Sequence, residues 1–261
     1  MKDVMERIQT TAGNRIGCRP DAVPSDLAYL TIGVVNVCLF GRPGAPNGGW
    51  VLIDAGLPGS ASRIRRAAHE WIGPWARPSA IVLTHGHPDH IGGLTEGGKP
   101  VFPKARYVFG AAEFDFWKRG ENVREARKFN RELYVKICLP LADRSTFIKP
   151  GDEVVPGITA VDAAGHSPGL LAFHIESSGK RIVISADTFT QYVMAVQRPE
   201  WHFEMDDDKD KAVATRKRML DMLTADKLFV AGFHMPFPGI GFVEIGQGGY
   251  RWVPHSYQLN L

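Results

Sequence analysis

Four residues with metal-binding side chains lie within six positions of one another. They are His85, His87, Asp89 and His90, and they follow the short apolar run Ile81 to Thr84. Imidazole nitrogens and carboxylate oxygens are ligands for zinc and also for iron, manganese or cobalt. The absence of thiolate ligands argues against a closed structural zinc site and favours an open, catalytic one. The alternative is that these are ordinary loop histidines at the start of a helix.

The spacing of these residues predicts two metal positions. In a chain leaving a strand, alternate side chains point to the same side, so His85 and His87 would face one position. Asp89 and His90 would begin a helix and face a second position. The pattern therefore predicts two neighbouring divalent ions, with zinc as the first choice.

The pattern His-x-His-x-Asp-His after an apolar strand resembles the signature of the metallo-β-lactamase superfamily of hydrolases. The family pattern continues with a His, an Asp and a last His, each at the end of a strand, and the sequence supplies His166, Asp187 and His234. The resemblance covers about residues 30 to 253. It implies an α/β fold in which two sheets are packed between outer helices, a four-layer αββα sandwich.

The resemblance also implies a role for each residue. Asp187 would bridge the two ions; the first ion would be held by His85, His87 and His166, and the second by Asp89, His90 and His234. A hydroxide bridging the ions would be the nucleophile, and both ions would polarise the substrate. We assign a catalytic role to the carboxylates Asp89 and Asp187, with a helix cap as the alternative for Asp187. Asp54, at a recurring family position, is interpreted as orienting a ligand or loop; a plain turn aspartate is the alternative.

The residue at position 187 also bears on the branch of the family. An Asp there, with no Cys, argues against a true β-lactamase, whereas glyoxalase-like thioesterases, lactonases and organophosphate hydrolases keep the Asp. The stretches Val193 to Trp201 and Phe233 to Gly241 resemble the methyl parathion hydrolase and acyl-homoserine lactonase-like branch. We therefore expect a metal-dependent hydrolase of a lactone, ester or phosphotriester, with a thioester as the alternative.

Apolar residues close in sequence to Asp187 and His234 predict a pocket for an acyl chain or an aromatic leaving group. The main candidates are Tyr192, Val193, Trp201 and Phe233, and the wider set adds Phe189, Met194, Phe203, Met235 and Phe237. The alternative is that they belong to the hydrophobic core. Tyr192 is the nearest tyrosine after Asp187 that could hydrogen-bond a substrate.

Two further hypotheses use fewer of these residues. One is an enzyme resembling persulfide dioxygenases, with a single iron held by His85, His87 and His166, which would leave the other three ligands without a direct role. The other makes the metal a structural brace of a binding protein. Metal content and redox activity distinguish these hypotheses from hydrolysis.

The elements expected around the site alternate between strands and helices. Predicted strands, including a first and a last hairpin, cover residues 30–40, 50–54, 81–84, 158–164, 170–176, 181–186, 228–231, 242–245 and 250–253. Helices are predicted over 60–71, 111–137 and 209–223, the second broken near Gly120 and forming a lid or cover over the site. The run Asp206 to Asp208 would cap the last helix. Two β-rich halves with outer helices predict one domain over residues 1–261.

Composition excludes several classes of protein. The 261 residues are 44% hydrophobic and 23% charged, which is typical of a globular protein, and the net charge of +3 is spread along the chain. We therefore expect a small-molecule substrate and neither a nucleic-acid nor a membrane partner; a homodimer is left open. The first ten residues lack the apolar core of a signal peptide, which favours a cytoplasmic location. Cys18, Cys38 and Cys138 are expected to be reduced thiols.

Overall fold

Two seven-stranded sheets form the centre of the structure, one from each half of the chain. The computed structural model describes residues 14–17, 23–74, 77–235 and 239–255, so the N-terminal segment, Cys18 and Phe237 lie outside it. The first sheet has the order β1 (Asn14–Gly17), β2 (Leu27–Ile32), β3 (Val35–Phe40), β4 (Val51–Ile53), β5 (Ala80–Val82), β8 (Arg106–Gly110) and β9 (Ser145–Ile148).

The second sheet follows the chain order. It contains β10 (Glu153–Val155), β11 (Ile158–Asp162), β12 (Leu171–Ser177), β13 (Lys180–Ala186), β14 (Phe229–Gly232), β15 (Ile240–Gly246) and β16 (Gly249–Pro254). In the first sheet the strands from β4 to β9 pair in parallel, and in the second sheet only the central pair, β13 and β14, is parallel. A separate small hairpin joins β6 (Thr95–Glu96) and β7 (Lys99–Pro100).

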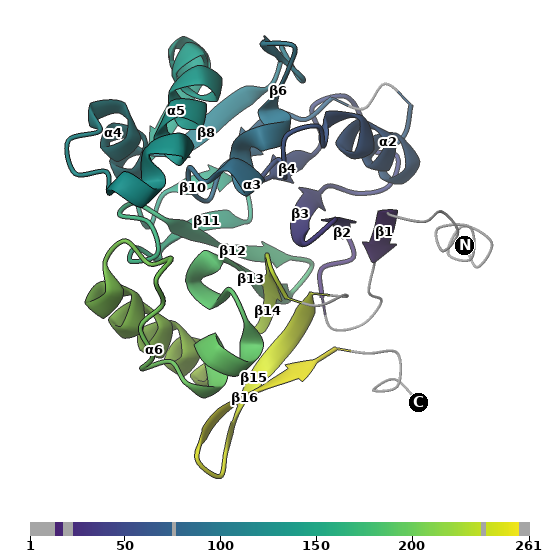
Figure 1. Cartoon of the computed structure of the whole chain (residues 1–261). Helices are drawn as coiled ribbons and strands as arrows, with labels where there is room; N and C mark the ends of the chain where they lie inside the picture. The colour runs from purple at the N-terminus through teal and green to yellow at the C-terminus, as the bar shows by residue number, and fades with distance from the viewer. Residues whose placement is uncertain (1–13, 18–22, 75–76, 236–238, 256–261) are drawn as a thin grey trace.

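Helices cover the outer faces of both sheets. Figure 1 shows α2 (Ala61–Trp71), α4 (Ala111–Arg119) and α5 (Lys128–Ile137) on one side, and α6 (Lys209–Ala225) on the other. The short helices are α3 (Pro88–Ile91), η1 (Gly92–Leu94), η2 (Glu125–Arg127), η3 (Leu139–Arg144), η4 (Asp187–Phe189) and the π-helix η5 (Tyr192–Gln197).

The alternation of side chains along the strands creates three separate cores. On β12, Phe173 and Ile175 face the other sheet, whereas Ala172 faces α6. On β5, Val82 faces the second sheet and Ile81 faces the outer helices. Because successive strand residues point to opposite faces, continuous apolar strands can be buried on both sides. Three cores between four layers confirm the predicted αββα sandwich.

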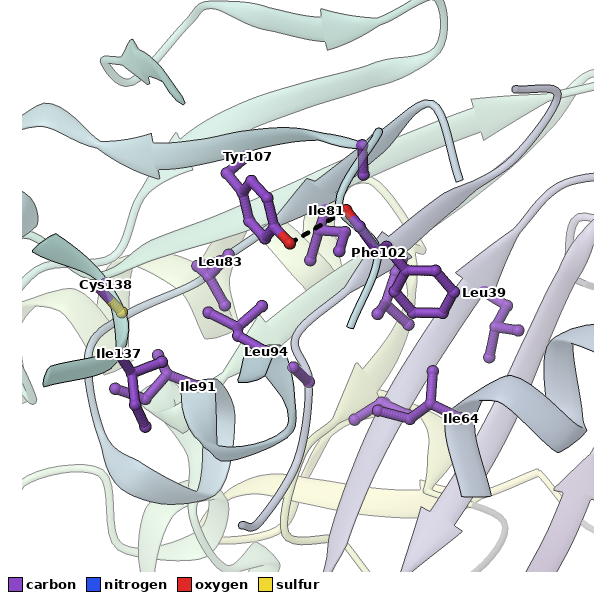
Figure 2. Packing of buried hydrophobic residues seen from close by; sticks show 14 of the residues in the cluster. Leu39, Ile64, Ile81, Leu83, Ile91, Leu94, Phe102, Tyr107, Ile137 and Cys138 are labelled. Carbon is purple, nitrogen blue, oxygen red and sulfur yellow. Dashed lines mark hydrogen bonds between the residues drawn. The ribbon is translucent and has the colours of Figure 1, made fainter. Parts of the chain in front are cut away.

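The core beneath the outer helices of the first sheet contains both strand and loop residues. Figure 2 shows Ile81 and Leu83 from the strand side packed near Ile91 and Leu94, which follow the segment with the candidate ligands. The Tyr107 hydroxyl donates a hydrogen bond to the carbonyl oxygen of Phe102 at 3.2 Å. The segment that carries the candidate ligands is thus anchored by its own apolar neighbours.

The predicted elements are present, but one predicted strand is divided, and strands β1 and β6 to β10 were not predicted. The run from Leu30 to Phe40 is not one strand, because Gly33, with a φ of +65°, turns the chain between β2 and β3. Strand β8, which pairs with both β5 and β9, was missing from the prediction. Its sequence, Arg-Tyr-Val-Phe-Gly, is short and has no strong turn residue directly before it. The first and last hairpins and all three predicted helical regions are confirmed.

The region 111–137 covers the first sheet as two helices, α4 and α5, which are joined by a loop. Gly120, with a φ of +71°, terminates α4 in the left-handed conformation that glycine adopts without strain. Trp117 and Tyr134 are buried in the core below. The segment is therefore fastened to the sheet by its apolar face, and its role as a lid stays a prediction.

None of the helices in the described part of the chain has the length and apolar character needed to cross a membrane.

Candidate metal centre

The first four candidate ligands occupy the loop and helix that follow β5. His85 and His87 precede α3, with His87 in extended conformation directly before its first residue, Pro88. Asp89 and His90 lie within the single turn of α3, as predicted. The change from extended to helical backbone between His87 and Asp89 sends the two pairs of side chains in different directions.

The three later candidates come from strand ends of the second sheet. His166 lies between β11 and β12, Asp187 is the first residue after β13, and His234 follows β14. Asp187 Oδ2 lies 3.3 Å from His166 Nε2 and 3.4 Å from His234 Nε2. Asp187 Oδ1 lies 3.2 Å from His90 Nε2. Loops that follow strands of both sheets thus contribute ligands to one cluster.

The seven side chains form two groups that share one carboxylate. His85, His87 and His166 lie together with Asp187, and Asp89, His90 and His234 lie together with the same Asp187. Within each group the potential ligand atoms are all within 4.8 Å of one another. This is the partition implied by the sequence resemblance.

The buried polar atoms of the cluster fit metal ions. His85 Nε2 and His87 Nε2 are buried and have no hydrogen-bond partner among the described residues, and the 3.2 Å contact between His90 Nε2 and Asp187 Oδ1 lacks hydrogen-bond geometry. Leaving such atoms unpaired costs free energy, because they have lost their contacts with water. Divalent ions would satisfy them, and the set of imidazole and carboxylate donors suits zinc or another transition metal.

The charges of the cluster also favour the binding of cations. Burial raises the pKa of Asp187, but His90, His166 and His234 outweigh it and hold that pKa well below its usual range. Burial lowers the pKa of His234, but hydrogen bonds to Asp187 and Asp89 raise it to about 10. For His85, burial and the neighbouring His90 both lower the pKa. The carboxylates thus attract positive charge, and metal binding would replace the protons on the histidines.

Asp54 directly follows β4 and contacts His90, a member of the second group, at the ring nitrogen Nδ1. Its carboxylate accepts hydrogen bonds from the Thr84 backbone N–H at 2.9 Å and from the Thr84 hydroxyl at 2.9 Å. His90 Nδ1 lies 2.8 Å from Asp54 Oδ2. A proton held between these two atoms leaves Nε2 of His90 free to face the cluster. The geometry agrees with an orienting carboxylate rather than a plain turn aspartate.

Asp54→Asn is expected to lower the metal affinity or the activity by about 10- to 100-fold, as for other carboxylates that orient a histidine ligand. The backbone should tolerate the change, because Asp54 has a φ of +60° and asparagine readily adopts this left-handed conformation. Competition titration against a metal-binding dye measures the effect. Asp162→Asn, at a half-exposed carboxylate beside Arg218, is the control. Equal metal affinity in both variants would contradict the prediction.

Asp206 plays the corresponding part for the first group. Its Oδ1 lies 3.0 Å from His166 Nδ1, and its Oδ2 accepts a hydrogen bond from Arg216 at 2.7 Å. Burial raises the pKa of Asp206, but the contacts with His166 and Arg216 lower it overall. The prediction that Asp206 belongs to the cap of α6 is therefore wrong. Asp208 is the cap, accepting a hydrogen bond from the Lys211 N–H at 3.0 Å.

The predicted pocket residues lie in different surroundings. Phe233 is buried in the core of the first sheet and stacks on His90, with ring centroids 3.6 Å apart. Val193 and Trp201 are exposed, and Tyr192 is partly buried beside the core under α6. Phe189 and Met235 are buried in that core, so for these two residues the alternative of a place in the hydrophobic core is correct.

Three buried residues near the ligands escaped the sequence analysis. They are Glu113 on α4, Asp206 and Arg216. Their partners include residues that are distant in sequence; Glu113 and Ser167, for example, are 54 positions apart. A buried charged residue has no local sequence signal, because its surroundings come from distant segments. Only the acidic run at 206–208 drew attention to one of them.

Comparison with known proteins agrees with this geometry. The metallo-beta-lactamase superfamily profile matches residues 30–232. The chain is 31% identical to a probable metallo-hydrolase, YflN of Bacillus subtilis (strain 168), over 193 residues, 66% of this chain and 70% of that protein. It is 29% identical to an N-acyl homoserine lactonase of Bacillus cereus over 153 residues, 58% of this chain and 53% of that protein.

Solved structures give the same result. AidC, a dizinc quorum-quenching lactonase, superposes with a TM-score of 0.73 and 26% identity, over 88% of this chain and 81% of that one. The hydrolase AbOPH shares the fold, with a TM-score of 0.76 and 23% identity, over 95% of this chain and 99% of that one. These neighbours are consistent with the lactonase-like branch. The chain therefore belongs to the metallo-β-lactamase superfamily and is a metal-dependent hydrolase.

Proposed function

We propose that this chain is a dinuclear hydrolase that opens a lactone or cleaves a related carboxylic ester. The observation that carries the proposal is the position of Asp187, which belongs to both groups of candidate ligands. A carboxylate shared between two complete ligand groups supports two ions, whereas a mononuclear site would need only one group.

Each candidate ligand has a part in this proposal. His85, His87 and His166 would hold one ion, and Asp89, His90 and His234 the other. Two divalent ions, zinc as the first choice, would supply a nucleophilic hydroxide at neutral pH and polarise the oxygen of the substrate. Asp54 and Asp206 would keep one histidine of each group in the tautomer that binds through Nε2.

Exposed apolar side chains on residues adjacent to the candidate ligands support a substrate with an apolar substituent. Val34 is 75% exposed, and its carbonyl oxygen lies 3.2 Å from His234 Nδ1. Met205 is 56% exposed and directly precedes Asp206. Val34 and Met205 thus place exposed apolar side chains next to residues that contact His234 and His166, which suits an acyl or aryl group.

The similar proteins support the choice of a lactone. AidC is a dizinc lactonase that was solved with an N-acyl homoserine product, and the Bacillus cereus relative is an N-acyl homoserine lactonase. Phosphotriesters and thioesters, the other predicted substrates, are tested beside lactones below. The cytoplasmic location and the homodimer stay predictions.

The test combines elemental analysis with a substrate panel. We expect about two metal ions per chain, and turnover of a lactone or aryl ester that stops on chelation and returns with zinc. The panel includes a thioester and a phosphotriester of matched apolar group, and oxygen uptake with a persulfide is followed in parallel. One iron per chain with oxygen uptake would overturn the proposal in favour of the dioxygenase hypothesis, and selective turnover of the thioester would replace the lactone.

A further inference from the structure

We propose that Glu113 is a positioning residue that holds the backbone carrying His85 and His87 against the backbone carrying His166. It would thereby set the geometry of the first group of metal ligands without touching a metal ion. The inference rests on the proposed dinuclear site and adds a residue that lies outside the family's ligand pattern.

The Glu113 carboxylate joins three segments of the chain. Its Oε1 accepts hydrogen bonds from the Gly86 backbone N–H at 2.9 Å and from Trp117 Nε1 at 2.6 Å. Its Oε2 accepts one from the Gly169 backbone N–H at 2.9 Å. The Ser167 hydroxyl lies 2.5 and 2.6 Å from the two oxygens. Gly86 stands between His85 and His87, and Ser167 directly follows His166.

Three of these partners can only donate hydrogen bonds to the carboxyl group. Two backbone amides and an indole nitrogen can only donate, so they require lone pairs on both Glu113 oxygens. The side chain is buried, and no Lys, Arg or His is within ion-pair distance of it in the described ranges. Burial raises the pKa of Glu113 above its usual value, and the hydrogen bonds from Ser167, Trp117, Gly86 and Gly169 offset only part of that rise. Burying a charge is costly unless donors surround it, as they do here.

Two glycines show how closely α4 approaches the ligand loops. A Cβ at Gly86 would lie 2.3 Å from Trp117 Nε1, and a Cβ at Gly169 would lie 2.1 Å from the backbone nitrogen of Glu113. The loop at Gly169 therefore packs directly on the backbone of α4, and the loop at Gly86 packs on the Trp117 side chain of the same helix. The carboxylate lies at this contact, where small displacements of either loop would break its hydrogen bonds.

The contacts of Glu113 concern one ligand group only. They involve the neighbours of His85, His87 and His166, and among the described residues Glu113 forms no hydrogen bond with Asp89, His90 or His234. Loss of the carboxylate should therefore weaken the first metal position more than the second. By analogy with other residues that support metal ligands, we expect a 10- to 100-fold loss of affinity there.

The experiment compares stepwise metal affinities of the wild-type protein with those of Glu113→Ala and Glu113→Gln, using zinc and a competing chromophoric chelator. Cobalt-substituted protein gives a second readout, since its visible absorption reports ligand geometry rather than activity. Glutamine keeps the shape and one acceptor oxygen, but its amide group cannot accept from the Gly169 N–H. We therefore expect a large loss at one position for alanine, a smaller loss for glutamine, and an altered cobalt spectrum in both.

Two controls separate positioning from general destabilisation. Asp115→Asn lies on the same helix at an exposed ion pair with Arg119. Phe173→Leu, in the core between the sheets, gives a loss of stability without contact to the ligand loops. Both variants should bind two zinc ions with the same stepwise affinities as the wild-type protein. If Glu113→Ala does not fold, Glu113→Gln and Ser167→Ala decide the question.

The outcomes distinguish this inference from the proposed function. A wild-type protein that binds only one ion would overturn the dinuclear proposal and this inference with it. Two wild-type ions, with unchanged affinities and cobalt spectra in Glu113→Gln and Ser167→Ala, would overturn the inference alone. An equal loss at both positions, matched by Phe173→Leu, would also overturn it, because the effect would then come from stability.

Discussion

Replacement of Asp187 by alanine is expected to lower kcat/KM by about 10³-fold or more and to leave less than one metal ion per chain. Asp187 lies within 3.4 Å of histidine nitrogens from both ligand groups, so both ion positions lose a ligand together. A metal that polarises the substrate contributes several kcal/mol to transition-state stabilisation, and about 1.4 kcal/mol corresponds to a factor of ten in rate.

Asp89→Ala is the matched variant for this prediction. Asp89 belongs to the second group alone, with its Oδ2 3.2 Å from His234 Nε2. It should therefore reduce the metal content to about one ion, whereas Asp187→Ala should affect both. Elemental analysis after gel filtration and initial rates on the best lactone or ester measure the difference. Two retained ions and unchanged turnover in Asp187→Ala would show that this carboxylate is no ligand.

Arg216→Met is expected to destabilise the protein by about 3–5 kcal/mol, because it leaves the buried Asp206 without its cation. Arg216 is buried, donates to Asp206 Oδ2 at 2.7 Å and donates to the Trp201 carbonyl oxygen at 2.6 Å. Its guanidinium also lies 4.4 Å from the ring centroid of Phe203. Methionine fills much of the space but replaces none of these donors.

Urea unfolding of the metal-free and metal-loaded proteins measures this loss. Arg251→Met removes an exposed ion pair with Glu244 and should cost less than about 1 kcal/mol. Because the contacts lower the pKa of Asp206, the stabilisation is present at neutral pH and is lost as the pH falls through the lowered pKa. A loss no larger than that of Arg251→Met would mean that the pair contributes little.

The fold could be predicted from the sequence wherever local patterns decide the structure. Apolar runs between glycine-rich turns identified most strands, and Gly120 marked the break between α4 and α5. The boundary inside residues 30–40 was missed, because a two-residue turn at Gly33 interrupts an otherwise continuous apolar run. Strand β8 was missed because its pairing partners, β5 and β9, are distant in sequence.

The candidate site divides in a similar way. The dense cluster at 85–90 was evident because four metal-binding side chains stand close together in one loop. His166, Asp187 and His234 were found through the family pattern, and their roles as ligands remain proposals. Asp206 and Asp208 could not be told apart in sequence, although one contacts His166 in the interior and the other caps α6 at the surface.

The sequence by itself determined the residue types that bind metals, the strands that precede them and the superfamily they resemble. Only the tertiary structure decided that Asp206 contacts His166, that Phe233 stacks under His90, and that Glu113 joins two ligand loops. The physical reason is the range of the interactions. Strand periodicity and turns depend on neighbouring residues, whereas buried hydrogen bonds and shared ligands depend on atoms that the folded chain brings together from distant segments.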